Sequence, residues 1–231
     1  MHWQIVTETN EDLIKQLQEC QAIENETVAK VMRQTDRKLY CRLANPYVDQ
    51  PDSIGDYATI SAPHMHAFAL ENFVDLIKAD SKILDVGSGC GYLTACFARL
   101  IEAKAQEENV TPSGRVYAIE NNPELVKFSI ENIISDNPKF FKEGRIKIVQ
   151  GDGRKGFIGS APYDIIYVGA ASPDIPTELI RQLNIDGRLL CPVGEKGNIQ
   201  KMEQYDRLNY KDVSRKILAD VMFLPLTDFK A

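Results

Sequence analysis

Apolar residues follow two patterns along the chain, and the patterns alternate between residues 82 and 193. Short, nearly continuous apolar runs predict buried strands at residues 83–86, 115–120, 145–150, 163–168 and 187–193. Apolar residues at helical spacing predict helices at 93–105, from Pro123 onward, and at 176–183. Strands that alternate with helices in this way predict an α/β fold with a mostly parallel, doubly wound sheet.

The segment before this core predicts a helical cap over the sheet. Asn10 is the expected N-cap of a first amphipathic helix, and Asn25 is the expected N-cap of a second. Residues 37–60 have little periodicity and contain two prolines, so we expect a long ordered loop there. Ser61 then caps a third predicted helix, with Pro63 tolerated in its first turn.

Two polar or irregular stretches complete the pattern. Residues 104–113 are charged and unpatterned, and we expect a solvated connector there. Residues 202–208 and 216–224 predict a closing antiparallel pair of strands. The chain is expected to be one domain, 1–231, made of N-terminal helices and a loop (1–80), a core (81–194) and closing strands (195–231).

Composition narrows the classes of protein that fit. The 231 residues carry a net charge of -6 with a pI near 5.2, which disfavours a nucleic-acid partner. No apolar run approaches the ~20 residues of a membrane span, and residues 1–13 lack the apolar centre of a signal peptide. Five cysteines without a C-x-x-C pair indicate reduced thiols. We therefore expect a cytoplasmic monomer without membrane or nucleic-acid partners.

The strongest chemical signal is a glycine loop after the first core strand. Gly87, Gly89 and Gly91 separate that strand from a helix, and such a turn lets the backbone approach a ligand. A dinucleotide loop would place its third glycine at position 92, which holds Tyr92. The G-x-G-x-G spacing instead resembles the loop of S-adenosylmethionine-dependent methyltransferases, and Glu120 ends the next strand where a carboxylate can bind ribose hydroxyls. On the loop alone, a plain strand-to-helix turn stays open.

Longer motifs carry a more specific resemblance. The stretch ATISAPHMH at 58–66 and the stretch LDVGSGCGY at 84–92 resemble the protein-L-isoaspartate (D-aspartate) O-methyltransferase family. Tyr163-Asp164 with VGAA at 168–171, GRLLCPVG at 187–194 and PLTD at 225–228 look like the later motifs of that family. The resemblance covers almost the whole chain. It implies a Rossmann-like fold, S-adenosyl-L-methionine as cofactor with S-adenosyl-L-homocysteine as product, and isoaspartyl-containing peptides and proteins as substrates.

The implied reaction is methyl transfer to the α-carboxylate of L-isoaspartyl and D-aspartyl residues in damaged proteins. The methyl ester then collapses to a succinimide, whose hydrolysis partly restores aspartate. The resemblance also implies roles for individual residues. Ser61 is the catalytic residue, and the other expected cofactor or junction residues are Ala58, Thr59, Ile60, His66, Asp85, Gly87, Ser88, Gly89, Glu120, Asn121, Asp152, Gly153 and Thr227.

Within that set, the family places residues 58–61 and His66 at the junction of substrate and cofactor. Asp85 and the glycines lie along the methionine part, Glu120 on the ribose, and Asp152 with Gly153 by the adenine. Thr227 closes the pocket. Three features depart from the family pattern: Cys90 replaces a hydroxyl residue, the connector at 102–113 is longer, and the chain stops soon after Thr227.

The chemistry suits a site without a general base. A carboxyl group has a reference pKa near ~4, so the nucleophile is ionised at neutral pH. Catalysis then depends on aligning oxygen, methyl and sulfur, which can supply roughly 7–11 kcal/mol. A neutral hydroxyl such as that of Ser61 can orient the carboxylate without greatly reducing its nucleophilicity.

Other interpretations remain open for single residues and for the whole chain. Ser61 can be only a helix cap, His66 a packed core histidine, and Asp85 an acid that caps loop amides. His64 and His66 do not share a helix face, so we expect no metal. A nucleic-acid or small-molecule methyltransferase is the alternative enzyme, although residues 169–172 lack the Asn/Asp-Pro-Pro-aromatic motif of amino-group methyltransferases. A binding module that has lost transfer is the alternative outside enzymes.

Overall fold

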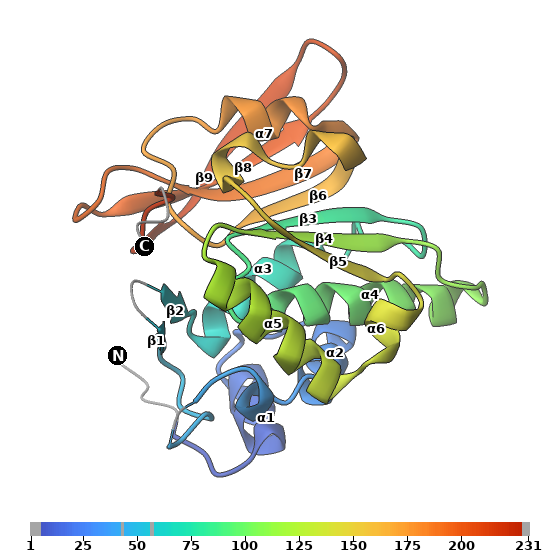
Figure 1. The fold of residues 1–231 in the computed structure, drawn as a ribbon, viewed down its shortest axis with the longest axis vertical. Helices are drawn as coiled ribbons and strands as arrows, with labels where there is room; N and C mark the ends of the chain where they lie inside the picture. Colours follow the sequence, from blue (N-terminus) through green and yellow to red (C-terminus); the bar gives the residue numbers. More distant parts are fainter. Residues whose placement is uncertain (1–5, 43, 56–57, 228–231) are drawn as a thin grey trace.

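The computed structural model describes residues 6–42, 44–55 and 58–227. A seven-stranded sheet with the order β5-β4-β3-β6-β7-β8-β9 runs through the molecule (Figure 1). Its strands are β3 (Lys82–Val86), β4 (Arg115–Glu120), β5 (Ile146–Gln150), β6 (Tyr163–Val168), β7 (Leu183–Val193), β8 (Gln200–Arg207) and β9 (Val213–Val221). The pairs from β5 to β7 are parallel, whereas β8 and β9 pair antiparallel. The predicted doubly wound sheet and closing antiparallel strands are confirmed.

The strand order reverses at β3, which pairs with β4 on one side and with β6 on the other. In open α/β sheets a ligand binds at such a switch point, outside the carboxyl ends of the strands. The glycine loop begins directly after β3, so it lies at this edge.

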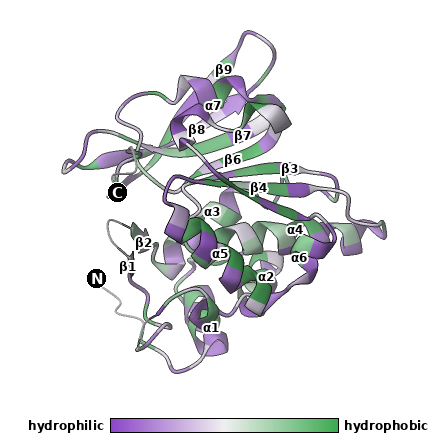
Figure 2. Ribbon diagram, viewed as in Figure 1, coloured by the Kyte–Doolittle hydropathy of each residue, from purple (hydrophilic) through white to green (hydrophobic). Residues whose placement is uncertain are grey.

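Helices cover both faces of the sheet. On one face lie α4 (Tyr92–Glu108), α5 (Pro123–Asp136) and α6 (Lys139–Lys142), and on the other lies α7 (Thr177–Arg181) (Figure 1). Alternate residues of β3 enter different cores, because Ile83 packs toward the α4 side while Leu84 and Val86 pack toward the other. Burial on both faces explains the nearly continuous apolar runs, and Figure 2 shows hydrophobic residues on the central strands and along α4.

Helices α1 (Asn10–Glu19) and α2 (Glu26–Gln34) form a further layer outside α4, and a short 3-10 turn, η1 (Arg37–Leu39), follows α2. Helix α3 (Pro63–Phe73) lies beside α4, where Phe73 contacts Phe97 and the Asn72 carbonyl accepts from Arg188 of β7. The sequence predicts a cap over the sheet, but α2 packs on α4 and α1 packs on α2 (Figure 1). The reason is that α4 is buried around most of its circumference, and a helix of that kind needs cover on its outer side.

Helix boundaries differ from the sequence prediction at several places. Thr9, not Asn10, caps α1, because its Oγ1 accepts from the Asp12 amide at 3.1 Å. The Asn10 side chain instead donates to the Met32 and Arg33 carbonyl oxygens and so joins α1 to α2. Asn25 caps α2 as predicted. Residues 106–108, expected only in the connector, belong to the last turn of α4.

The expected loop at 37–60 contains structure that its composition hides. Besides η1, it holds a small antiparallel hairpin of β1 (Asp52–Gly55) and β2 (Ala58–Ile60). The prediction of a plain loop was therefore wrong for these residues. These strands are too short for an alternation of apolar and polar residues to be recognised. Pro51, directly before β1, also indicates a loop.

Ser61 does not cap α3, which corrects the sequence prediction. Ala62 is the N-cap, and it makes no side-chain capping hydrogen bond. Pro63 is the first helical residue, and a proline disfavours helical conformation in the residue before it. Ala62 accordingly has φ -57° and ψ 146°, which leaves Ser61 one residue outside the helix.

Candidate functional site

The glycine loop makes a tight turn that requires glycine. Gly87, Gly89 and Gly91 have φ values of 72°, 53° and 85°, a region that other residues rarely adopt. A Cβ on Gly91 would lie 2.9 Å from Ile133 Cδ1, so α5 packs directly against the loop. Gly91 is also the N-cap of α4, which gives the strand–turn–helix arrangement predicted from the sequence.

Glu120 fastens this loop to the end of β4. Its Oε2 accepts from the Gly89 amide at 3.0 Å, and its Oε1 accepts from the Asn121 and Asn122 amides at 2.9 Å and 3.1 Å. The side chain is only 7% exposed. Each carboxylate oxygen has two acceptor positions, so Oε2 retains one for a ligand at the switch point.

Ser88 and Asp85 flank the same turn. The Ser88 Oγ is buried and has no hydrogen-bond partner among the residues that the structure describes. Such orphaned groups are rare in folded proteins, and a ligand can satisfy this one. Asp85 is 1% exposed and its Oδ2 accepts from the Thr94 hydroxyl at 2.6 Å, so its side chain points toward α4. Burial raises the pKa of Asp85 to about 7, although the Thr94 hydrogen bond opposes the rise.

Asp85 predicts a pH-dependent stability. Its pKa in the folded chain is about 7 against 3.8 for a free side chain, so the folded state binds the proton more tightly. Stability that is present below pH 4 is therefore lost as the pH rises through 7. We expect Asp85→Asn to flatten the decline of melting temperature between pH 5 and 8, relative to the parent.

Thermal melts at several pH values measure this effect. Asp80 supplies the matched control, since Asp80→Asn makes the same change at a solvent-exposed position. If the melting temperatures of the parent and of Asp85→Asn fell equally with pH, the raised pKa of Asp85 would be contradicted.

Asp152 and Gly153 follow β5 at the same edge. Asp152 is half-buried and pairs with Arg154 at 2.8 Å, and that hydrogen bond lowers the pKa of the carboxyl. A Cβ on Gly153 would lie 2.6 Å from Val86 Cγ1 and 3.4 Å from Leu226 Cδ2. Gly153 therefore lets the end of β3 and the C-terminal segment approach one another.

The C-terminal segment crosses the ends of β4 and β6. The Leu226 amide donates to the Ala171 carbonyl at 2.8 Å, and the Asn121 side chain donates to the Thr227 carbonyl at 2.6 Å. Thr227 is exposed. Asp228, the last residue of the PLTD stretch, lies outside the described residues.

The β1–β2 hairpin brings residues 58–61 toward the loop. Ile54 Cδ1 would lie 3.3 Å from a Cβ on Gly89, so β1 rests on the glycine turn. Ala58 and Ser61 are half-buried, Thr59 is exposed and Ile60 is 2% exposed. The Ser61 hydroxyl makes no hydrogen bond within the described part of the chain.

The two histidines of α3 have different surroundings. His64 is exposed, and its Nδ1 lies 2.9 Å from Asp49. His66 is buried, and its ring stacks on that of Tyr92 with 4.6 Å between centroids. Burial, with help from Arg37 and His64, lowers the pKa of His66 well below 6.5. In the described part of the chain, no group of three or more His, Cys, Asp or Glu side chains is arranged to hold a metal ion.

The structure thus gathers most of the predicted residues at one edge. The glycine loop, Glu120, Asn121 and the segment ending at Thr227 are linked by hydrogen bonds. Sequence reasoning missed several residues that shape this edge, namely Arg37, Ile54, Tyr92, Thr94 and Leu226. Tyr92 and Leu226 lie within the LDVGSGCGY and PLTD stretches, which gave them no role of their own. Thr94 had a readable signal, since a hydroxyl in the first turn of a helix lies close to the strand before it.

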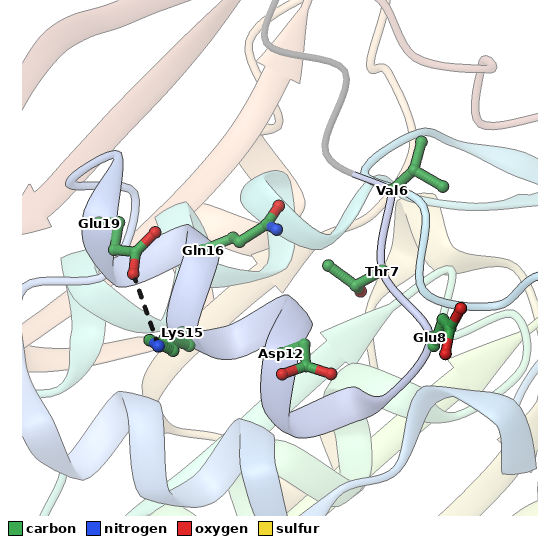
Figure 3. A pocket seen from close by; sticks show the side chains of 7 residues that line it. All are labelled: Val6, Thr7, Glu8, Asp12, Lys15, Gln16 and Glu19. Atoms are coloured by element: carbon green, nitrogen blue, oxygen red, sulfur yellow. Dashed lines mark ion pairs between the residues drawn. The ribbon is translucent and has the colours of Figure 1, made fainter.

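A separate hollow of about 300 Å³ lies along α1 (Figure 3). Its lining is polar and shares no residue with the predicted site: Val6, Thr7, Glu8, Asp12, Lys15, Gln16 and Glu19. Lys15 and Glu19 form an exposed ion pair at 4.0 Å on its wall. We therefore place the functional site at the carboxyl edge of β3. Within the part of the chain that the structure describes, none of the helices has the length and apolarity needed to cross a membrane.

Comparisons with known proteins give one consistent answer. A sequence model of the family described as protein-L-isoaspartate(D-aspartate) O-methyltransferase matches residues 8–231. The chain is 42% identical over 225 residues to protein-L-isoaspartate O-methyltransferase 1 of Arabidopsis thaliana, covering 96% of this chain and 93% of that one. It is 39% identical over 227 residues to the Caenorhabditis elegans protein-L-isoaspartate O-methyltransferase, covering 98% and 96%.

A solved structure extends the similarity to three dimensions. It is a putative protein-L-isoaspartate O-methyltransferase from Plasmodium falciparum, in complex with S-adenosyl-L-homocysteine. The two chains superpose with a TM-score of 0.86 at 31% identity, covering 96% of this chain and 100% of that one.

Proposed function

This chain belongs to the protein-L-isoaspartate(D-aspartate) O-methyltransferase family, and from that premise we propose how the edge of β3 performs the reaction. The activity is methyl transfer from S-adenosylmethionine to isoaspartyl residues of damaged proteins. We assign the site from one observation. Glu120 accepts a hydrogen bond from the glycine loop at the point where the strand order reverses.

The residues at this edge fit the cofactor. The orphaned Ser88 hydroxyl and the free acceptor position of Glu120 Oε2 offer polar contacts on either side of the turn. Glu120 and Asn121 would hold the ribose, and Gly87 and Gly89 would let the backbone approach the methionine part. When bound, the cofactor supplies an electrophilic methyl group on a sulfonium.

Ser61 is the proposed catalytic residue. The residue is half-buried, its hydroxyl is not used by the helix cap, and it directly follows β2 of the hairpin that rests on the glycine loop. It would donate a hydrogen bond to the substrate carboxylate and hold the attacking oxygen in line. The nucleophile needs no base at neutral pH. Asp152 and Gly153 would lie by the adenine, and residues 58–60, His66 and Thr227 would complete the pocket.

A methyl-transfer assay with an isoaspartyl peptide and its aspartyl twin tests this function. Radiolabel from S-adenosylmethionine should enter only the isoaspartyl peptide, as a base-labile ester. Transfer to neither peptide would favour a binding module without activity, and transfer to a nucleic acid or small molecule would favour another methyltransferase.

Glu120 should control cofactor affinity. We expect Glu120→Ala to weaken binding of S-adenosylhomocysteine at least tenfold, because a charge-assisted hydrogen bond contributes roughly 1.5–3 kcal/mol. The loss should exceed that of a simple ribose contact, since the variant also releases the Gly89 amide and loosens the turn.

Calorimetry measures this difference, with Glu124→Ala as the control for an exposed glutamate at the start of α5. NAD should give no binding in the same experiment, because Tyr92 replaces the third dinucleotide glycine. Unchanged affinity in folded Glu120→Ala would remove Glu120 from the site.

We further propose that the chain acts as a cytoplasmic monomer with one domain, without nucleic-acid or membrane partners. The absence of disulfides among its five cysteines and its net charge of -6 support this.

A further inference from the structure

Arg37 is a buried arginine without an acidic partner. Its side chain is 1% exposed, and it forms no ion pair with any residue that the structure describes. Nη2 donates to the Gln50 carbonyl at 3.4 Å, and Nε has no hydrogen-bond partner in the same part of the chain. A buried cation without a counter-charge is costly, so its placement calls for an explanation.

Among the described residues, His66 supplies the side-chain polar atom that the Arg37 guanidinium contacts. Arg37 Nη1 lies 3.5 Å from His66 Nδ1. An arginine has only donors, so Nδ1 must be the acceptor and carries no proton. A neutral ring in this contact therefore carries its proton on Nε2. The groups that face the ring are Arg37 from η1, His64 from α3 and Tyr92 from α4, and none of them is an acid that would favour the charged form.

The other ring nitrogen of His66 has no partner of this kind. Nε2 makes no hydrogen bond to any residue that the structure describes, and the residue is 5% exposed. The ring stacks on Tyr92, which follows Gly91 at the end of the glycine turn. His66 also lies one helical turn beyond Pro63, close in sequence to Ser61. The His66 ring therefore lies beside the end of the glycine turn, at the start of the helix that follows Ser61.

We propose that Arg37 is a positioning residue that fixes His66 as the Nε2–H tautomer, which then donates to a carboxylate at the junction of substrate and cofactor. The inference rests on the proposed function, since that function brings two carboxylates to this wall. One is the substrate α-carboxylate and the other belongs to the methionine part of the cofactor. A neutral donor orients a carboxylate without taking up a proton, so turnover should stay nearly flat from about pH 6 to 8.

The first test observes the tautomer in the free enzyme. Nitrogen-15 NMR of the His66 imidazole should show a protonated Nε2 and an unprotonated Nδ1 in the parent, with a titration midpoint well below 6.5. Arg37→Met should give mixed tautomers and a pKa closer to 6.5, whereas Arg37→Lys should keep the parent pattern. An unchanged tautomer in folded Arg37→Met would overturn the proposal.

The second test measures recognition. Arg37→Met should raise the KM for an isoaspartyl peptide about tenfold if the substrate carboxylate is the acceptor, the size of one charge-assisted hydrogen bond. It should weaken S-adenosylhomocysteine binding by a similar factor if the cofactor carboxylate is the acceptor. If the tautomer changes and neither constant moves, the proposed role is wrong.

Two further variants separate this role from folding. Arg145 is another buried arginine whose Nε has no partner among the described residues, but its Nη atoms donate to the Gly114 and Pro112 carbonyls. Arg145→Met should therefore change melting without changing the tautomer or either constant. If Arg37→Met does not fold, His66→Gln should keep the peptide KM within a few-fold, whereas His66→Leu should raise it about tenfold. Equal KM values for His66→Gln and His66→Leu would also overturn the proposal. A parent enzyme that transfers no methyl group would refute only the proposed function.

Discussion

Ser61→Asp should melt near the parent temperature and lose most methyl transfer to an isoaspartyl peptide. Ser61 lies outside α3, since Ala62 is the N-cap, so the variant removes no capping hydrogen bond. A half-buried aspartate would however place a negative charge beside the incoming carboxylate and repel it. Because the proposed role requires a neutral donor, the loss should appear in turnover at saturating cofactor.

Companion variants make the role of Ser61 specific. Ser61→Thr keeps a hydroxyl and should retain part of the activity, limited by its extra methyl group. Ser61→Ala should bind cofactor normally and turn over slowly, with little change in melting, because no cap is lost. Ser53→Asp adds the same charge to an exposed position of the same hairpin and should be active. Normal methyl transfer by Ser61→Asp would show that residues other than Ser61 orient the substrate carboxylate.

The sequence predicts the central sheet well because burial on both faces leaves a strong signal. β4 and β6 begin and end at the predicted residues, since each is a continuous apolar run with distinct ends. β7 begins at Leu183, earlier than the apolar run that predicts it, because its first residues alternate in burial and resemble a helix end. The start of α3 also follows from the sequence. Pro63 disfavours helical conformation at Ala62, so Ser61 cannot be the N-cap.

The residues of the candidate site also fall into those that the sequence predicts and those that it does not. The glycine loop and Glu120 are readable because chemistry restricts which residues can make that turn and where its acid can stand. Arg37, Tyr92 and Ile54 are not readable, since each reaches the loop through tertiary packing between distant elements. Asp85 shows the limit of motif reasoning. Its position beside the loop is as expected, but alternation along β3 directs its side chain toward Thr94 on α4.

A buried ion pair beneath the site gives the largest expected effect on stability. Arg99 of α4 donates two hydrogen bonds of 2.7 Å to Asp136 at the end of α5. The two side chains are 9% and 6% exposed. Arg99 also donates to Thr35 at 3.1 Å, and the Tyr40 hydroxyl donates to Asp136. The pair thus joins α4 and α5 to the segment that carries Arg37.

Arg99→Met should destabilise the fold by about 3–5 kcal/mol, because it leaves the Asp136 charge buried without its partner. For a chain of this length that corresponds to a fall in melting temperature of roughly 10 °C. The double variant Arg99→Met with Asp136→Asn should recover much of the loss, since it removes the unpaired charge as well. Lys127→Met breaks an exposed pair with Glu131, at 3.9 Å, and should change melting little. Urea unfolding of the parent and the three variants measures these differences, and similar losses for Arg99→Met and Lys127→Met would show that the buried pair contributes no more than the exposed one.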